Sequence, residues 1–251
     1  MRVDFDLWPY PRLVAHRGAG RLAPENTLAA FRVGAACGYR MFEFDVKLSG
    51  DGVPFLLHDA TLERTTSGAG VAGALTWSQL SALDAGGWHG AGFAGEPIPR
   101  LSSIERYLQA NGFLADIEIK PSPGTDDETG RVVAAHCERS WHDAGTPPIL
   151  TSFSEAALEA AAVQSPALPR GLLLDTLPGD WLDRIRRLDA LALAANHRVL
   201  SAEIVAVAHA ERIRVLCYTA NEPARVALLL KWGVDCVITD AVDRISVESQ
   251  A

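Results

Sequence analysis

Cysteine is scarce in this sequence, and its four copies form no paired motif. They are widely separated and lie in apolar stretches: Cys37, Cys137, Cys217 and Cys236. A free cysteine in such a stretch behaves as a small hydrophobic side chain, and no CxxC pair suggests another role. We therefore expect four reduced structural thiols.

Long uncharged hydrophobic runs are also lacking. No segment is apolar over the length that a bilayer requires. Residues 1–12 are interrupted by acidic residues and prolines, where a signal peptide would need an apolar run. No basic or aromatic membrane-binding segment is identifiable. The sequence predicts a cytoplasmic protein without stable membrane association, and we expect a monomer or a homodimer.

Basic residues are outnumbered by acidic ones. The sequence has 23 Lys and Arg residues and 31 Asp and Glu residues, which gives a formal net charge of -8. No run of like charge suggests a nucleic-acid-binding face, so no nucleic-acid partner is expected. A phosphate ester can still bind to an acidic protein where a metal ion and a few basic side chains reverse the field locally.

Short apolar runs alternate with amphipathic segments along the 251 residues, which predicts one domain built as a (β/α)8 TIM barrel. Eight strands are expected at residues 13–16, 41–45, 114–120, 149–153, 171–174, 190–195, 215–219 and 236–239. Seven helices are expected at residues 26–37, 101–111, 129–144, 155–164, 180–188, 201–211 and 223–232.

A ninth apolar run, at residues 53–58, follows the second strand after only the turn 49–52. Four residues are too few for a parallel crossover, so this run must return antiparallel. We therefore predict a β-hairpin over residues 47–57 that brings His58 to the barrel mouth beside Asp45.

Some forty residues rich in Gly, Ser and Thr replace the next crossover helix. Residues 60–100 could be a mobile surface loop, but a small cap-like insertion is favoured because five apolar side chains could pack together. They are Trp77, Leu80, Leu83, Trp88 and Phe93.

Three carboxylates are spaced for one side of the predicted sheet. Glu43 and Asp45 lie two apart on the second strand, and Glu118 and Lys120 repeat the spacing on the third, so each pair shares a face. Carboxylates that face one another must be held by a cation. A hard metal ion with oxygen ligands meets that need, and structural ion pairing is the alternative.

Two histidines accompany these carboxylates at predicted strand ends. His16, followed by Arg17, ends the first strand, and His58 directly follows the hairpin. Hydrolysis of a phosphodiester needs one group to accept a proton from the nucleophile and another to give one to the leaving alkoxide. Imidazoles, with an ordinary pKa of about 6.5, suit both tasks at neutral pH.

Several motifs resemble those of the glycerophosphodiester phosphodiesterase family, of the cytoplasmic bacterial type, and occur in the family's order. They are His16-Arg17-Gly18, Pro24-Glu25-Asn26-Thr27, Glu43-Phe44-Asp45-Val46, His58-Asp59-Ala60-Thr61-Leu62, Glu118-Ile119-Lys120, Thr151-Ser152-Phe153 and Val237-Ile238-Thr239-Asp240. The resemblance extends over nearly the whole chain. It implies metal-assisted hydrolysis of a small-molecule glycerophosphodiester to sn-glycerol 3-phosphate and an alcohol.

The resemblance also implies roles for individual residues. The acid and base would be His16 and His58. One divalent cation, Mg2+ or Ca2+, would be held by Glu43, Asp45 and Glu118. Substrate would contact Arg17, Glu25, Asn26, Lys120, Phe153 and Tyr218. Tyr218 and Val242 depart from residues common in the family, which leaves the shape of the substrate pocket open.

Two alternative functions remain open at this point. A phospholipase C-like or sphingomyelinase D-like barrel could use the same histidines, but such enzymes act on membrane lipids. A non-catalytic barrel could merely bind phosphorylated ligands, since a fold does not establish turnover. The two histidines beside three carboxylates argue against the second alternative.

Overall fold

The computed structural model describes residues 3–246, and within them eight parallel strands close into a barrel. The strands are β1 (Leu13–His16), β2 (Met41–Leu48), β4 (Leu114–Ile119), β5 (Ile149–Ser152), β6 (Arg170–Leu174), β7 (Ala192–Asn196), β8 (Arg214–Tyr218) and β9 (Cys236–Thr239). Pairing of β1 with both β2 and β9 completes the ring. The predicted (β/α)8 barrel is confirmed; residues 1–2 and 247–251 of the predicted domain lie outside the described range.

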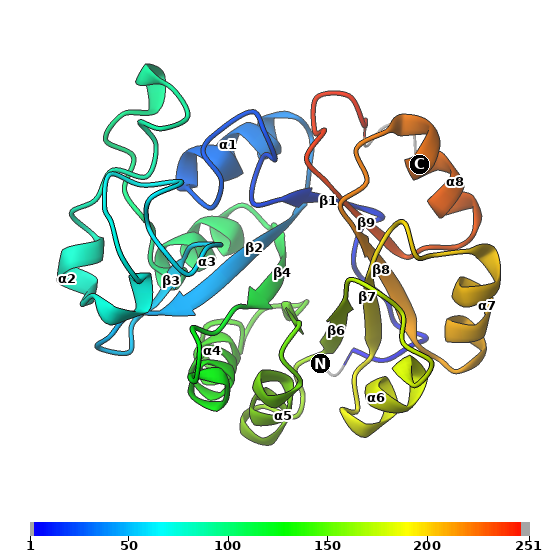
Figure 1. Cartoon of the computed structure of the whole chain (residues 1–251). Helices are drawn as coiled ribbons and strands as arrows, with labels where there is room; N and C mark the ends of the chain where they lie inside the picture. The colour runs from blue at the N-terminus through cyan, green and yellow to red at the C-terminus, as the bar shows by residue number, and fades with distance from the viewer. Residues whose placement is uncertain (1–2, 247–251) are drawn as a thin grey trace.

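Helices surround the barrel between successive strands (Figure 1). They are α1 (Leu28–Ala36), α3 (Leu101–Ala110), α4 (Asp126–Ser140), α5 (Glu155–Gln164), α6 (Trp181–Arg187), α7 (Ala202–Ala210) and α8 (Pro223–Lys231). Hydroxyl side chains cap the first turns of α1, α5 and α7. Within residues 3–246, none of these helices combines the length and apolarity that a membrane crossing requires.

Strand β2 divides its side chains between two environments. Phe42, Phe44 and Val46 are fully buried in the main core between barrel and helices. The alternate side chains, Glu43 and Asp45, therefore face the barrel interior, as the period of two requires. A second apolar cluster, formed partly by the N-terminal segment with Val3 and Tyr10, fills the other end of the barrel.

The predicted hairpin is confirmed. Strand β3 (Pro54–Leu56) pairs antiparallel with β2, with Val46 opposite Leu56. The Leu57 amide then donates to the Asp45 carbonyl oxygen at 3.2 Å. This bond fixes the start of the next segment, so that His58 lies at the barrel mouth.

The insertion after β3 contains a 3-10 turn, η1 (Ala72–Ala74), the short helix α2 (Trp77–Leu80) and a second 3-10 turn, η2 (Ala91–Phe93). Trp77, Leu80 and Leu83 share a cluster with the hairpin. Trp88 and Phe93 do not join it, so the prediction of one five-residue cluster is wrong for these two.

Local contacts explain the different position of Trp88. Its indole donates to the Ala85 carbonyl and its ring packs edge-on against His89, which leaves 43% of the residue exposed. His89 in turn contacts Phe93 and the carbonyl of Arg21 in the loop between β1 and α1. His89 therefore attaches this segment to that loop, and Phe93 packs against the main core.

Candidate active site

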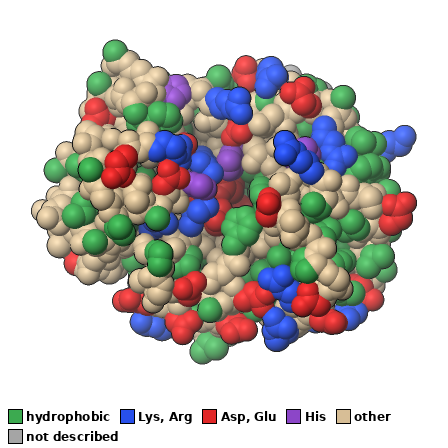
Figure 2. All heavy atoms as spheres, viewed as in Figure 1, with side chains coloured by type: hydrophobic (Ala, Val, Ile, Leu, Met, Phe, Trp, Pro, Cys, Tyr) green, Lys and Arg blue, Asp and Glu red, His purple; other side chains and the backbone are tan. Residues whose placement is uncertain are grey.

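A cavity of about 140 Å3 lies where the barrel strands end. Most of the predicted site residues line it: His16, Arg17, Glu43, His58, Glu118, Lys120, Phe153 and Tyr218. Figure 2 shows acidic atoms at the bottom of a hollow near the middle of this face, with histidine and basic side chains around them. The barrel thus brings together residues that are up to about 200 positions apart, as parallel strand ends do.

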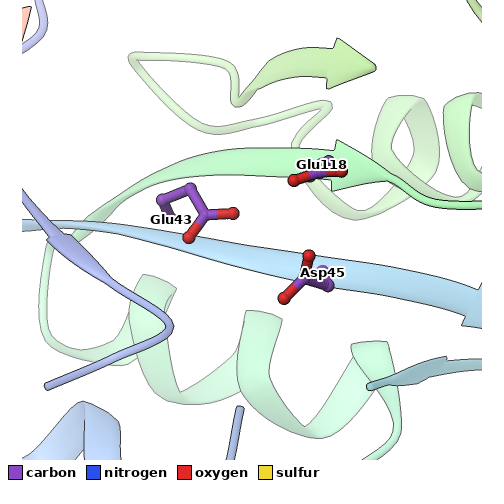
Figure 3. A group of neighbouring side chains, drawn as sticks. All are labelled: Glu43, Asp45 and Glu118. Atoms are coloured by element: carbon purple, nitrogen blue, oxygen red, sulfur yellow. The ribbon is translucent and has the colours of Figure 1, made fainter. Parts of the chain in front are cut away.

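Three carboxylates form a cluster in this hollow. Glu43 and Asp45 extend from β2 and Glu118 from β4, and one oxygen of each lies within 4.8 Å of the others (Figure 3). The register explains the proximity, because Asp45 stands directly opposite Glu118. The ammonium of Lys120 donates to Asp45 at 3.1 Å and to Glu118 at 2.9 Å.

The charges of this cluster are not balanced by the side chains around it. Burial, with the charges of Asp45 and Glu118, raises the pKa of Glu43 well above its usual range. Burial and Asp45 raise the pKa of Glu118 to about 7. Burial also opposes ionisation of Asp45, but Lys120 and Arg17 hold its pKa below the usual range.

This imbalance fits a hard divalent cation. An added positive charge would keep all three carboxylates ionised, and oxygen donors are the ligands that Mg2+ and Ca2+ prefer. Opposing ligands of Ca2+ are separated by about 5 Å, twice the Ca–O distance, so the spread of the oxygens suits such an ion. The residues present are therefore able to hold a metal ion.

Arg17, Glu25 and Asn26 build the wall behind Asp45. The Arg17 backbone amide donates to Glu43 at 3.1 Å, and its guanidinium donates to Glu25 at 2.8 Å. Asn26 donates to the Asp45 carboxylate at 2.8 Å and accepts from the Asp45 amide at 3.2 Å. Glu25 and Asn26 do not themselves line the cavity but contact Arg17 and Asp45 of the site.

His16 is held by an aspartate from the other end of the chain. Its Nδ1 lies 2.6 Å from Asp240, which follows β9, and its Nε2 lies 3.7 Å from Glu43. Burial opposes ionisation of Asp240, but the hydrogen bond and charge of His16 lower its pKa to about 2. Asn221 donates to the second oxygen of Asp240 at 2.9 Å. These contacts leave Nε2 of His16 directed at the carboxylate cluster.

His58 has a similar partner. Its Nδ1 lies 2.7 Å from Asp59, and Arg64 donates to both oxygens of that carboxylate. Arg64 also donates to both oxygens of Glu25 at 2.8 Å, and so connects His58 to the Arg17 side of the site. Burial lowers the pKa of His58, although Asp45 opposes the shift.

Sequence reasoning missed the two aspartate partners and a further acid, Asp116. Asp116 is 1% exposed, lines the cavity and accepts from Thr151 at 2.7 Å. Burial raises its pKa to about 7, and its second oxygen has no hydrogen-bond partner among residues 3–246. The signal was present, because Asp116 lies two before Glu118 on one strand and must share its face.

Two aromatic side chains close one side of the cavity. Phe153 and Tyr218 pack edge to face with their ring centroids 5.8 Å apart, and the Lys120 ammonium lies 6.0 Å from the Phe153 centroid. His197, by contrast, does not line the cavity and contacts Arg225 instead. The site therefore has an apolar wall next to the ammonium of Lys120.

A model of the glycerophosphoryl diester phosphodiesterase family matches residues 16–244. A glycerophosphodiester phosphodiesterase of Caldanaerobacter subterraneus subsp. tengcongensis is 31% identical over 233 residues, covering 91% of this chain and 93% of the relative.

Solved structures show the same similarity. A phosphodiesterase of Oleispira antarctica, in complex with the product sn-glycerol-3-phosphate, is 31% identical, with a TM-score of 0.88 and 96% of each chain covered. A glycerophosphodiester phosphodiesterase of Agrobacterium tumefaciens is 27% identical, with a TM-score of 0.77, covering 93% of this chain and 98% of that one.

Proposed function

Since this chain belongs to the glycerophosphoryl diester phosphodiesterase family and hydrolyses glycerophosphodiesters, we propose that it releases sn-glycerol 3-phosphate and a free alcohol through the site described above. The observation that supports this most is the placement of two histidine–aspartate pairs around one cluster of three carboxylates. Acid–base groups and a candidate metal site are then available on the same phosphodiester.

In this proposal Glu43, Asp45 and Glu118 hold one divalent cation, Mg2+ or Ca2+. When bound, such an ion polarises a phosphoryl oxygen and neutralises charge there. Arg17 and Lys120 contact the remaining phosphate oxygens, since both cations line the cavity beside the cluster. Glu25 and Asn26 act indirectly by holding Arg17 and Asp45.

The aspartate partners fix the proton positions on the two histidines. A carboxylate on Nδ1 favours the tautomer that carries its proton there, so Nε2 of His16 can accept a proton and protonated His58 can donate one. We propose His16 as the base that activates the nucleophile and His58 as the acid that protonates the leaving alcohol. Roles exchange if a second step follows.

The inner cavity suits the glycerol part of the substrate. Its volume of about 140 Å3 is small, Phe153 and Tyr218 supply an apolar wall, and the free oxygen of Asp116 can accept from a hydroxyl. The phosphate would then lie at the carboxylate cluster. In this placement the glycerol 2-hydroxyl attacks phosphorus and expels the alcohol. The glycerol part is left as a cyclic phosphate, which water then opens.

The deciding experiment measures sn-glycerol 3-phosphate released from a panel of glycerophosphodiesters, with Mg2+ or Ca2+ added. Turnover of these small diesters without activity on lipid vesicles supports the proposal over a phospholipase C-like or sphingomyelinase D-like enzyme. Binding of the diesters without turnover would instead indicate a non-catalytic barrel.

Replacing Glu118 by Gln should weaken metal affinity by about tenfold or more. Loss of an outer-sphere partner alone costs about 10- to 100-fold, and Glu118 is proposed as a direct ligand. Calorimetric titration of the purified variant with Ca2+ measures the effect. An unchanged titration would remove Glu118 from the ligand set.

The same variant should fold normally without metal. The fold raises the pKa of Glu118 to about 7, above its ordinary value. The free energy of unfolding of the metal-free protein therefore falls as pH rises from that ordinary value to about 7. A neutral amide avoids this loss. At pH 8 the melting temperature of metal-free Glu118→Gln should therefore equal or exceed that of the wild type.

Replacing Arg64 by Gln should lower kcat about tenfold with little change in melting temperature. The variant loses the bidentate contacts to Glu25 and Asp59, and His58 then loses its fixed orientation. The Arg64 side chain is 45% exposed and its ion pairs are partly screened by water, so its loss should have little effect on the fold. The exposed Arg131, replaced by Gln in parallel, serves as the control. Equal kcat for the two variants would show that Arg64 has no positioning role.

We further propose that residues 60–100 form a cap-like insertion within a single domain. The contacts of Arg64 with Glu25, and of His89 with Arg21, attach this insertion to the loop that bears the Arg17 side of the site. The cytoplasmic location, the monomeric or homodimeric state and the lack of nucleic-acid or membrane partners stay predictions from the sequence.

A further inference from the structure

A second groove, of about 520 Å3, adjoins the active-site cavity. Its walls come from residues 58–61, which follow β3, and from residues 120–123, which follow β4. His58 and Lys120 line both the groove and the cavity. A phosphate held at these two side chains would have space for one substituent in the cavity and for the other in the groove.

Lys47 lines this groove and has no part in the function described so far. It lies on the same face of β2 as Glu43 and Asp45 and is only 2% exposed. Its ammonium has three donors. Among residues 3–246 it makes one hydrogen bond, to the carbonyl oxygen of Lys120 at 3.2 Å. A buried cation with donors to spare is suited to an incoming acceptor.

Ser122, in the segment that follows β4, supplies a second polar group. It is 8% exposed, and its buried hydroxyl oxygen has no hydrogen-bond partner within the described part of the chain. A buried polar atom without a partner is costly, so each such atom in a native protein calls for an explanation, such as a bound water or ion. Lys47 and Ser122 together offer donors and an acceptor to one occupant.

The acidic residues of the groove are already engaged. Asp59 accepts from Arg64 and pairs with His58, and Asp126 accepts from the Ser154 hydroxyl at 2.6 Å. Besides His58 and the two lysines, the other lining side chains are small, and no Phe, Tyr or Trp lies among the described residues that form the groove. Quaternary ammonium groups are bound by aromatic faces, so this groove is poorly suited to choline.

We propose that this groove binds the leaving alcohol, and that Lys47 and Ser122 select alcohols rich in hydroxyl groups. Glycerol or inositol esters are then better substrates than choline or ethanolamine esters, whose cationic groups would approach two lysines. This inference rests on the proposed function, since the groove has meaning for specificity only if a glycerophosphodiester is cleaved beside it.

The first test ranks leaving groups with the wild-type protein. We expect kcat/KM for glycerophosphoglycerol and glycerophosphoinositol to exceed that for glycerophosphocholine and glycerophosphoethanolamine by about tenfold or more. The glycerophosphate ester of ethanol serves as the reference without extra polar groups. Cleavage of the ethyl ester, with choline or ethanolamine preferred over the polyols, would overturn the inference while the proposed function stands. Absence of cleavage for every ester would instead contradict the proposed function.

The second test uses Lys47→Met and Ser122→Ala. Each should lower the ratio of polyol to ethyl ester kcat/KM by about tenfold, because donors to the polyol hydroxyls are lost. Lys231→Met, at an exposed position at the end of α8, is the matched control and should leave the ratio unchanged. An unchanged ratio in both groove variants would overturn the inference. Should Lys47→Met fail to fold, Ser122→Ala and the wild-type ranking decide.

Discussion

Removal of the divalent cation by a chelator is expected to reduce release of sn-glycerol 3-phosphate by about 10³-fold or more. Without the ion, Glu43, Asp45 and Glu118 would repel an anionic phosphodiester. Lys120 and Arg17 do not remove this repulsion, because both already pair with Asp45. Metal-ion catalysis contributes several kcal/mol, and about 4 kcal/mol corresponds to roughly 10³-fold in rate. The measurement is initial rate after exhaustive dialysis against chelator.

Restoration distinguishes loss of the ion from loss of the fold. Activity should return on adding back Mg2+ or Ca2+, and circular dichroism should show the barrel intact throughout. Full turnover by protein shown to be metal-free by elemental analysis would contradict the metal assignment.

A substrate without the glycerol 2-hydroxyl should be cleaved about 10⁵-fold more slowly than its parent if the hydroxyl is the nucleophile. Well-oriented intramolecular groups reach effective molarities of ~10⁵ M or more, and this advantage disappears with the hydroxyl. The two histidines support the cyclic route because each can act as base in one step and as acid in the other.

Binding must be measured alongside turnover. The 2-deoxy analogue should compete with the parent substrate at a similar concentration, so that slow cleavage reports chemistry alone. Rapid hydrolysis of the bound analogue would exclude obligatory cyclisation and favour direct attack by water. Capture of the cyclic phosphate from the parent substrate in rapid-quench experiments would support the opposite conclusion.

The strand pattern and much of the site could be predicted because both depend on the period of two. Once β2 and β4 are neighbours, alternation alone decides that Glu43, Asp45 and Glu118 share the interior. The hairpin followed from the length of one turn. These are local rules, and the structure obeys them.

Features that depend on irregular backbone or on closure of the barrel could not be predicted. Arg17 and Asn26 have positive φ angles of 51° and 60°, and the loop between them places Glu25 against Arg17 and Asn26 against Asp45. Such conformations are uncommon outside glycine and have no clear signature in composition. The exposed position of Trp88 likewise results from its own contacts with Ala85 and His89.

The pairing of His16 with Asp240 joins the first strand of the barrel to the last. During synthesis the three clustered carboxylates and both histidines are made long before Asp240, which lies 224 residues after His16. Gly20 packs closely on Asp240: a Cβ added to Gly20 would lie 2.2 Å from the Asp240 Cα. The loop after β1 and the segment after β9 are therefore in tight backbone contact. A chain that stops before β9 therefore lacks the carboxylate that orients His16, and under the proposed mechanism it would lack an oriented base.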